Sequence, residues 1–300
     1  MEVISKIKFG TVVVVGRPNT GKSTLINTLM NQKVAITSPL PQTTRRVTKV
    51  LYEDERGKFI LTDTPGVFNK VSDLIGKKVN PQAGNALYQA DVIVCTVDVS
   101  RPKNEEENKV IGLVRKSNAK KILVLNKIDE IFLGNDHTSE YLYLEDEFDF
   151  TLKLSGLKGT HKKSLLEKIY EYLPETEVEQ ANEMIESFGL HLGPKISMSS
   201  EEYISEIIRE KAYLSLRKEV PYSVHVIVDS VEEKPGVTVI KARILTTADR
   251  YKKMIIGMGG KKIKYIGFTA RKELELMSGK KVFLELKVET DTHWMERIEL

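Results

Sequence analysis

The chain has 300 residues, enough for two ordinary domains. Hydrophobic residues make up 41% and charged residues 29%, a balance typical of globular proteins that excludes disorder along the whole length. The one cysteine, Cys95, cannot form an internal disulfide and fits a reducing compartment, as a small buried residue of an apolar run. No apolar run approaches the ~20 residues that span a bilayer, and residues 1–6 lack a secretory signal pattern, so we expect a cytoplasmic protein.

The net charge of +4 comes from 46 basic and 42 acidic residues, and its distribution is uneven. Residues 250–287 contain eleven Lys and Arg and three Glu, a local charge of +8, so the rest of the chain sums to −4. A basic C-terminal end on a slightly acidic protein indicates a polyanionic partner, although a solvated Lys-rich surface alone would look the same.

The first half of the chain alternates short apolar runs with stretches that suit helices. Strands are predicted at 11–15, 59–62, 92–97 and 122–125, because these runs are apolar without a break, as in strands buried on both faces. Helices are predicted at 22–30, 104–117 and 163–172. Such alternation predicts an α/β domain with a mostly parallel sheet over residues 1–174.

The second half follows a different order. Residues 175–199 show no clear strand period and are predicted to be a linker with a short helix at 178–188. Residues 200–300 then read as a helix, two strands, two helices and a strand, at 201–218, 223–230, 237–246, 250–256, 262–277 and 281–289. This order predicts a smaller α+β domain.

The segment after the first strand matches a phosphate-binding loop, Gly-x-x-x-x-Gly-Lys-Ser, without gaps. Glycines let backbone N–H groups approach phosphate oxygens, and the following helix adds the positive end of its dipole. Lys22 is expected to neutralise the β- and γ-phosphates, and the Ser23 hydroxyl to ligate Mg²⁺. The expected nucleotide-binding residues of this segment are Gly16, Arg17, Pro18, Asn19, Thr20, Gly21, Lys22, Ser23 and Thr24.

Two further segments complete the expected magnesium site. Asp63 begins Asp-Thr-Pro-Gly after a predicted strand, where its carboxylate can hold Mg²⁺, and Gly66 can present its N–H to the γ-phosphate. The polar loop Gln42-Thr-Thr-Arg-Arg46 lies between the two motifs, and one threonine there could join the Mg²⁺ shell only when γ-phosphate is present. Thr44 is the first choice and Thr43 the second, with an ordinary exposed loop as the alternative. The expected metal ligands are therefore Ser23, Thr44 and Asp63.

The sequence Asn126-Lys-Ile-Asp129 follows the strand at 122–125 and selects the base. The Asp129 carboxylate can accept two hydrogen bonds from guanine N1 and its exocyclic amine, a donor pair that adenine lacks. We expect Asn126 to contact the base edge and the Lys127 stem to lie over the ring. Ser155 and Gly156, after a weak strand at 150–154, are expected to offer N–H groups to the guanine oxygen. The predicted ligand is GTP or GDP.

These motifs in this order resemble translation-factor-type GTPases. The wording Gly-Arg-Pro-Asn-x-Gly-Lys-Ser, with Gln-Thr-Thr-Arg and Asp-Thr-Pro-Gly, resembles the bacterial Era family. Segments 206–211, 220–224 and 256–264 resemble that family's second domain, so the likeness covers nearly the whole chain and is weakest in the linker. It implies a Ras-like GTPase domain followed by a type II KH domain. It also implies assembly of the small (30S) ribosomal subunit through binding of the 3′ region of 16S ribosomal RNA. We expect a monomer, and a minor third reading places the protein peripherally at the inner membrane through its basic face.

A KH domain grips single-stranded RNA with a Gly-x-x-Gly loop between two helices. Gly257 and Gly260 have that spacing, and positions 258 and 259 are Met and Gly where the family commonly has polar and basic residues. The expected RNA-binding residues are Arg250, Lys252, Lys253, Gly257, Met258, Gly259, Gly260, Lys261, Lys262 and Lys264. His225, His293 and Trp294 have no partners at a diagnostic spacing and are assigned no chemistry.

Other departures from the family bear on catalysis. Thr20 stands where Val is usual and Gly156 where Ala is usual, and Val67 occupies the position at which many GTPases carry a water-positioning glutamine. Related GTPases with such a replacement use K⁺ in place of an arginine finger, and Asn19 stands at the loop position associated with K⁺. We hypothesise that Asn19 helps to hold K⁺, with Lys22, Thr44 and Gly66 as the other catalytic residues. The alternative function is a GTP-gated RNA-binding module with negligible hydrolysis.

Overall fold

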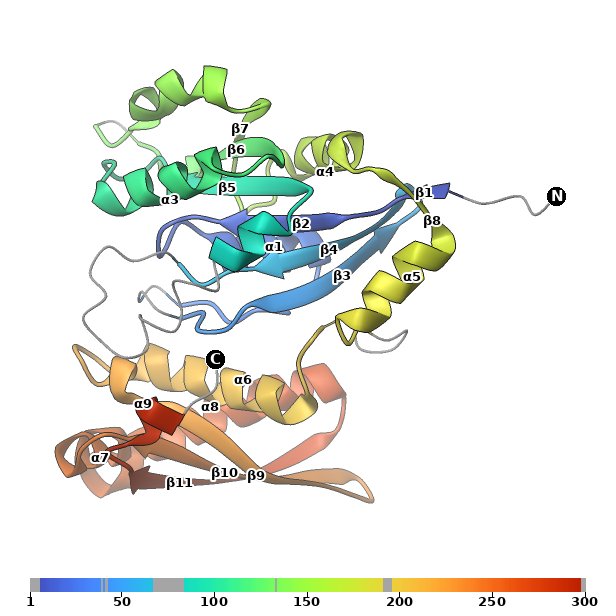
Figure 1. Cartoon of the computed structure of the whole chain (residues 1–300). Helices are drawn as coiled ribbons and strands as arrows, with labels where there is room; N and C mark the ends of the chain where they lie inside the picture. The colour runs from blue at the N-terminus through green and yellow to red at the C-terminus, as the bar shows by residue number, and fades with distance from the viewer. Residues whose placement is uncertain are drawn as a thin grey trace. The chain divides into compact units, whose positions relative to one another are not determined.

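The computed structural model describes residues 6–38, 40, 43–66, 84–132, 134–190 and 196–297. The chain divides into two compact units, one comprising residues 1–37 and 44–197 and the other residues 38–43 and 198–299. Figure 1 shows the course of the chain through both. Gln42 and Val67, which the sequence analysis singled out, lie outside the described residues.

The first unit is built on an eight-stranded, mostly parallel sheet in the order β7-β6-β5-β2-β4-β1-β8, with β3 paired to β4. Strands β2, β4, β5, β6 and β7 run parallel to their neighbours in this set, whereas β3 and β8 pair antiparallel with β4 and β1. The strands are β1 (Lys6–Lys8), β2 (Thr11–Val15), β3 (Thr48–Asp54), β4 (Gly57–Asp63), β5 (Val92–Asp98), β6 (Lys120–Asn126), β7 (Phe150–Leu154) and β8 (Glu175–Glu177).

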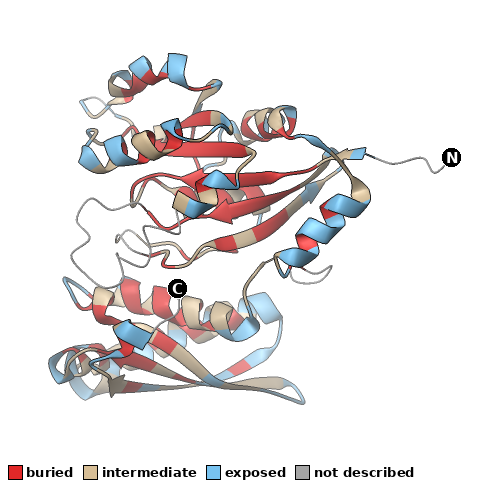
Figure 2. Ribbon diagram, in the orientation of Figure 1, coloured by how far each residue is buried: buried red, intermediate tan, exposed pale blue. Residues whose placement is uncertain are grey.

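The central strands are buried on both faces, as their unbroken apolar runs predict (Figure 2). Because successive side chains of a strand point to opposite faces, Val12 and Val14 enter one core with α1 (Lys22–Met30) and α4 (Lys162–Tyr172). Val13 and Val15 enter the other core, with Cys95 and α3 (Glu105–Arg115). Because these strands are parallel, the loops at their carboxyl ends meet at one edge of the sheet.

The segment predicted as a linker has more structure than the sequence indicated. Residues 175–177 form β8, which pairs with β1, and α5 (Val178–Ser187) follows directly. Ala181 and Ile185 of α5 pack with Phe9 of the β1–β2 region and with Leu51 and Ile60 in a small apolar cluster. Strands β1 and β8 have only three residues each, too few for a period-2 pattern to show in the sequence.

The second unit is a three-stranded sheet in the order β11-β10-β9, with β10 parallel to β11 and antiparallel to β9. Helices α6 and α8 cover one face of this sheet (Figure 1). The elements are α6 (Ser200–Ser215), β9 (His225–Lys234), β10 (Val237–Thr246), α7 (Asp249–Ile256), α8 (Lys261–Ser278), β11 (Lys281–Thr290) and α9 (Trp294–Arg297). The predicted fold class, a mostly parallel α/β sheet followed by a smaller α+β domain, is confirmed.

Short 3₁₀ segments connect several of these elements: η1 (Ile128–Glu130), η2 (Thr138–Glu147), η3 (Pro221–Ser223) and η4 (Met258–Gly260). Within the described ranges, every helix is too short or too polar to cross a bilayer.

Candidate nucleotide site and candidate RNA-binding loop

The phosphate-binding loop joins the carboxyl end of β2 to the start of α1. Its glycines are dictated by close approach: a Cβ at Gly16 would lie 2.5 Å from the Thr96 carbonyl oxygen, and one at Gly21 would lie 2.4 Å from the Asn126 Nδ2. Gly21 also has φ +92°, a left-handed conformation that glycine adopts without steric cost. The loop is thus tightly packed and leads directly into α1. The backbone N–H groups of the loop therefore lie at the N-terminus of that helix.

Lys22 is held inside this loop by the loop's own backbone. Its Nζ donates to the carbonyl oxygens of Gly16 (3.1 Å) and Arg17 (2.9 Å), and the side chain is buried. Burial lowers the pKa of Lys22 to about 8, while the nearby Asp63 carboxylate opposes this shift. A buried ammonium group with only carbonyl partners gains most from an anionic ligand, and phosphate oxygens supply one.

The three predicted metal ligands lie together. The Ser23 Oγ donates to Asp63 Oδ2 over 2.9 Å and lies 3.1 Å from the Thr44 Oγ1. Asp63 ends β4 and is fully buried, and its Oδ1 has no hydrogen-bond partner among the described residues. Burial raises the pKa of Asp63 to about 6, with Lys22 and the Ser23 hydroxyl partly offsetting that effect. One carboxylate and two hydroxyls around an unsatisfied buried oxygen fit a hard divalent cation such as Mg²⁺.

Two further residues predicted for this site, Thr43 and Gly66, have contacts of their own. Thr43, the second choice for Mg²⁺, belongs to the second compact unit, where its hydroxyl donates to the Leu40 carbonyl and its own carbonyl accepts from Arg209. The Thr43 hydroxyl thus has a backbone partner in its own unit, and its place at Mg²⁺ stays a prediction. Gly66 lies against the loop, since a Cβ there would be 2.9 Å from Pro18.

Asn126 ends β6 and ties two loops together. Its Nδ2 donates to the Thr20 carbonyl (2.7 Å), and its Oδ1 accepts from the Gly156 N–H (2.8 Å). The side chain expected at the base edge thus braces the phosphate loop against the loop at 155–156. Ser155 in turn donates its hydroxyl to Asp129 Oδ1 over 2.5 Å, so the carboxylate expected to read guanine is already oriented.

Asp98, which the sequence analysis did not select, ends β5 and binds two basic side chains. Its Oδ2 lies 3.0 Å from the Lys127 Nζ and accepts from the Arg101 Nε over 2.6 Å. Arg101 also donates to the Asn19 carbonyl over 3.2 Å, and Asn19 has φ +64°. The available signal was positional: Asp63, Asp98 and Asn126 each end a strand at the same edge of the sheet.

A second unpredicted group lies behind the loop. The Arg17 Nε is 3.1 Å from Glu107 Oε1, which also accepts the Tyr141 hydroxyl over 2.7 Å. All three side chains are buried, and the other oxygen of Glu107 caps α3 by accepting from the Asn104 N–H. Both Glu107 oxygens accept hydrogen bonds, whereas the buried Arg17 Nε meets Glu107 as an ion pair without an aligned hydrogen bond, so this group links the loop to α3 mainly through charge.

Thr20, which stands where the family usually has Val, has polar partners here. Its Oγ1 lies 3.1 Å from the Arg17 carbonyl oxygen and 3.0 Å from the Thr96 Oγ1, which itself donates to the Val15 carbonyl. Because a hydroxyl has one hydrogen and that of Thr96 goes to the Val15 carbonyl, the Thr20 hydroxyl donates either to the Arg17 carbonyl or to the Thr96 Oγ1, and in either case it has an acceptor.

In the second unit, the loop between α7 and α8 depends on its glycines. Gly257 has φ +72° and ψ 171°, a region that side chains essentially exclude, and a Cβ there would lie 2.8 Å from the Lys262 Cβ. Gly259 and Gly260 also have positive φ, and a Cβ at either position would meet nothing within 4 Å. The backbone of this loop is consequently open on its outer side, and Met258 is 83% exposed.

Basic side chains surround this loop. Lys253, Lys261 and Lys264 are exposed, Lys252 and Lys262 are half-buried, and Arg250 donates to the Tyr251 hydroxyl over 2.7 Å. Exposed lysines beside an open glycine loop suit a sugar-phosphate backbone, as the sequence predicted.

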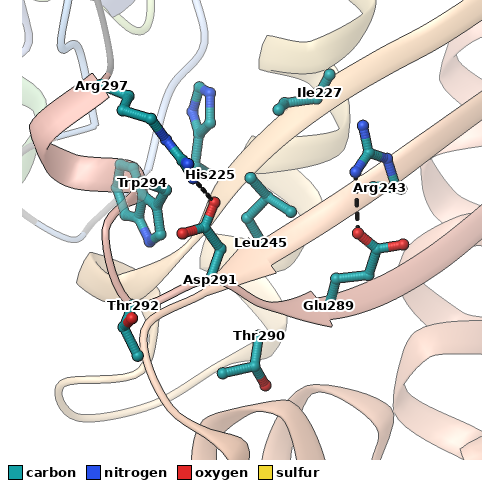
Figure 3. A pocket seen from close by; sticks show the side chains of 10 residues that line it. All are labelled: His225, Ile227, Arg243, Leu245, Glu289, Thr290, Asp291, Thr292, Trp294 and Arg297. Atoms are coloured by element: carbon teal, nitrogen blue, oxygen red, sulfur yellow. Dashed lines mark hydrogen bonds and ion pairs between the residues drawn. The ribbon is translucent and has the colours of Figure 1, made fainter.

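A cavity of about 640 Å³ lies at one end of the three-stranded sheet of the second unit (Figure 3). His225 stacks on Trp294, whose indole N–H donates to the Ser223 carbonyl, so Trp294 fastens the C-terminal segment to the sheet. The charges around the cavity are paired: Arg243 with Asp229 and Glu289, and Arg297 with Asp291. This arrangement gives His225 and Trp294 structural contacts.

Comparisons with known proteins identify the family of each part of the chain. Residues 11–127 match the family described as 50S ribosome-binding GTPase, and residues 219–295 match the KH domain family. The fold and site thus define a P-loop GTPase that carries a KH domain. The chain is 36% identical to GTPase Era of Aquifex aeolicus (strain VF5), over 98% of this chain and 97% of that protein. It is 34% identical to GTPase Era of Borreliella burgdorferi (strain ZS7), over 98% of both. The chain belongs to the GTPase Era family.

Solved structures give the same result. An Aquifex aeolicus Era variant bound to GDP and AlF₄⁻ superposes with a TM-score of 0.86 at 33% identity, covering 97% of this chain and 96% of that one. An Era in complex with MgGDPNP and nucleotides 1506–1542 of 16S ribosomal RNA has a TM-score of 0.84 at 33% identity, with the same coverage. The family assignment made from the motifs is confirmed.

Proposed function

We propose that this protein is a GTP-hydrolysing switch that acts in small-subunit assembly by binding the 3′ region of 16S ribosomal RNA. The observation that carries the proposal is the convergence of Ser23, Thr44 and Asp63 beside Lys22, in a chain that also presents an open glycine loop edged by lysines. Support for the RNA comes from the Era structure solved with nucleotides 1506–1542. We further propose residues 1–174 as the GTPase domain, 175–199 as the connecting segment and 200–300 as the KH domain.

In this proposal the loop residues Gly16–Ser23 hold the phosphates through backbone N–H groups. Lys22 leaves its two carbonyl partners for the β- and γ-phosphates, because an anionic partner restores the charged form of a buried amine. Ser23, Thr44 and Asp63 hold Mg²⁺, which supplies charge neutralisation at the phosphates. Thr44 lies in the loop that we expect to become ordered when γ-phosphate is bound. Because its hydroxyl contacts Ser23, we propose that Thr44 is the Mg²⁺ ligand that distinguishes GTP from GDP.

Base selection rests on Asp129. Its Oδ1 is oriented by Ser155, and Asn126 keeps the 155–156 loop at a fixed distance from the phosphate loop. A desolvated carboxylate left without the N1 and amine donors of guanine would oppose adenine binding. We therefore expect GDP and GTP to bind far more tightly than ADP and ATP, and the variant Asp129→Asn, which exchanges acceptor for donor, to lose that preference.

For hydrolysis we propose that Asn19 helps to hold K⁺ and that Gly66 presents its N–H to the γ-phosphate. Support comes from the placement of Asn19 within the loop, in a left-handed conformation that Asn tolerates, and of Gly66 against Pro18. K⁺ would supply positive charge near the phosphates in place of an arginine.

Two measurements test this proposal. Titration with fluorescent GDP, with and without Mg²⁺, should show tight binding that ATP does not displace; displacement by ATP at equal concentration would contradict the base assignment. Hydrolysis rates at equal ionic strength in KCl and NaCl test Asn19. Equal rates in the two salts would remove the K⁺ proposal while leaving GTP binding intact.

A further inference from the structure

Helix α8 carries a row of residues that the fold does not use. Lys261, Tyr265, Phe268 and Lys272 follow each other at intervals of four, three and four residues, so they share one face of the helix. We call this row the α8 stripe. Tyr265 is 60% exposed and Phe268 52% exposed.

The opposite face of α8 makes the core. Ile266, Ala270 and Leu274 are buried there, and Gly267 lets the Leu286 side chain of β11 approach closely. Two aromatic rings turned away from this core gain little from folding, because each leaves apolar surface in water. Lysine and arginine side chains lie within one helical turn of each ring, and farther along the same face lies Leu276, which is 85% exposed.

The charge of this surface is positive. Lys261, Lys264 and Lys272 are exposed along it, and the Arg271 Cζ lies 5.7 Å from the Phe268 ring centre. The two acids of the helix offset little of this charge: Glu273 pairs with Lys211, and Glu275 accepts from the Val282 N–H and lies 3.9 Å from the Lys272 Nζ. Rings interleaved with an excess of cations form a surface suited to nucleic acid, in which bases stack on the rings and phosphates meet the cations.

The α8 stripe is continuous with the glycine loop. Lys261 follows Gly260 directly, and the eleven steps from Lys261 to Lys272 extend about 16 Å along the helix axis. Tyr265 and Phe268 lie within that distance, so a strand that leaves the loop along α8 meets both rings.

We propose that the α8 stripe is a second, stacking subsite for single-stranded RNA that continues from the loop Gly257–Gly260. The inference rests on the proposed RNA-binding function. A membrane surface is the weaker reading, because an interfacial helix needs a broad apolar face, and the apolar face of α8 is buried in the domain's own core.

The test compares two RNAs from the 16S 3′ region on the whole chain. One has about four nucleotides, the number that a KH loop clamps, and the other about twelve. The double variant Tyr265→Ala/Phe268→Ala should bind the long RNA at least about tenfold more weakly, at about 1–3 kcal/mol per stacked base, and the short RNA unchanged. Phe283→Ala, which removes a 58% exposed phenyl ring from β11, is the matched control and should leave both affinities as they are.

The salt dependence separates stacking from charge. The double aromatic variant should keep the slope of log affinity against log salt, whereas Lys261→Gln/Lys272→Gln should reduce it by about 0.7 for each lost phosphate contact. Tyr265→Phe, which keeps the ring, should retain affinity for the long RNA.

The outcomes are distinct. If the wild type binds both RNAs and the double variant matches it on both, the stripe proposal is overturned and the RNA-binding function stands. If the wild type binds neither RNA, both fail. If the double variant loses binding to phosphatidylglycerol vesicles but not to the long RNA, the stripe is a membrane surface and the proposal is overturned.

Discussion

Asp63, the metal ligand that we propose at the end of β4, is buried in the protein. Its carboxylate is buried with one oxygen unsatisfied, and burial raises its pKa to about 6. An acid whose pKa is raised on folding binds more protons in the native than in the unfolded state, so stability falls as the pH rises through that interval. The site therefore trades stability of the free protein for affinity toward a cation.

We predict that the metal-free protein loses stability between about pH 4 and pH 6, by on the order of 3 kcal/mol, as Asp63 ionises. Asp63→Asn should flatten this dependence and abolish Mg²⁺-dependent GTP binding. Mg²⁺ affinity of the wild type should also weaken below pH 6, because protons compete for the carboxylate. Urea unfolding at several pH values measures the first effect; identical pH profiles for wild type and Asp63→Asn would refute it.

Thr20 and Thr96 are predicted to be coupled. Thr20→Val removes one buried hydroxyl, with its contacts to the Arg17 carbonyl and the Thr96 Oγ1, and should lower the free energy of unfolding by about 0.5–1.5 kcal/mol; Thr96 keeps its bond to the Val15 carbonyl. A double-mutant cycle with Thr96→Val measures the interaction, which should be about 0.5 kcal/mol or more. Strict additivity of the two single costs would show that the hydroxyls do not interact.

At the scale of elements, the sequence was most informative where side-chain pattern and local motif coincide. The run Thr11–Val15 is β-branched throughout, and both it and the helix after the glycine loop were predicted with the observed bounds. Strand β3 was missed because its residues mix charged and apolar types and it is specified by pairing with β4. Likewise motifs singled out Ser23, Thr44 and Asp63, which lie together in the structure, whereas Asp98 and the Arg17–Glu107 pair depend on tertiary contacts that no spacing records.

Helix α5 gives an element-scale prediction. Ile185 is 6% exposed in the cluster with Phe9 and Ile60, so Ile185→Ala should destabilise the first unit by about 2–4 kcal/mol. Met184, its more exposed neighbour, provides the control, and Met184→Ala should change stability by less than about 0.5 kcal/mol. Hydrogen exchange of the β1 and β8 amides measures the loss of stability in this part of the first unit. Equal, small effects of the two substitutions would mean that 175–190 behaves as a free connector.

A second prediction at the scale of elements concerns the loop between α7 and α8. Gly257→Ala places a Cβ 2.8 Å from Lys262 in a conformation closed to side chains, so RNA affinity should fall about tenfold or more. Gly259→Ala places a Cβ in open space in the left-handed region, so it should lower the free energy of unfolding by about 1–2 kcal/mol and change RNA affinity less than Gly257→Ala does. Fluorescence anisotropy with a 16S 3′ RNA distinguishes them, while GDP affinity serves as the check on folding. Equal losses would place the effect outside the loop geometry.

At the scale of the whole molecule, one chain carries a nucleotide site and a candidate RNA-binding loop. If GTP and RNA binding are coupled, the coupling is reciprocal: RNA must raise GTP affinity by the same factor by which GTP raises RNA affinity. Thr44 is the residue through which that coupling would register γ-phosphate, because it meets Ser23 from a separate segment of the chain. Thr44→Ala should leave GDP affinity unchanged and remove the difference in RNA affinity between the GTP and GDP states.

The most direct test of the central claim is single-turnover GTP hydrolysis by the whole chain in Mg²⁺ and K⁺, with and without an RNA of the 16S 3′ region. The account predicts hydrolysis above the rate of GTP in protein-free buffer, dependent on Asp63 and changed by RNA. Hydrolysis at the buffer rate in both arms, with GTP and RNA both bound, would contradict it and leave a GTP-gated RNA-binding module.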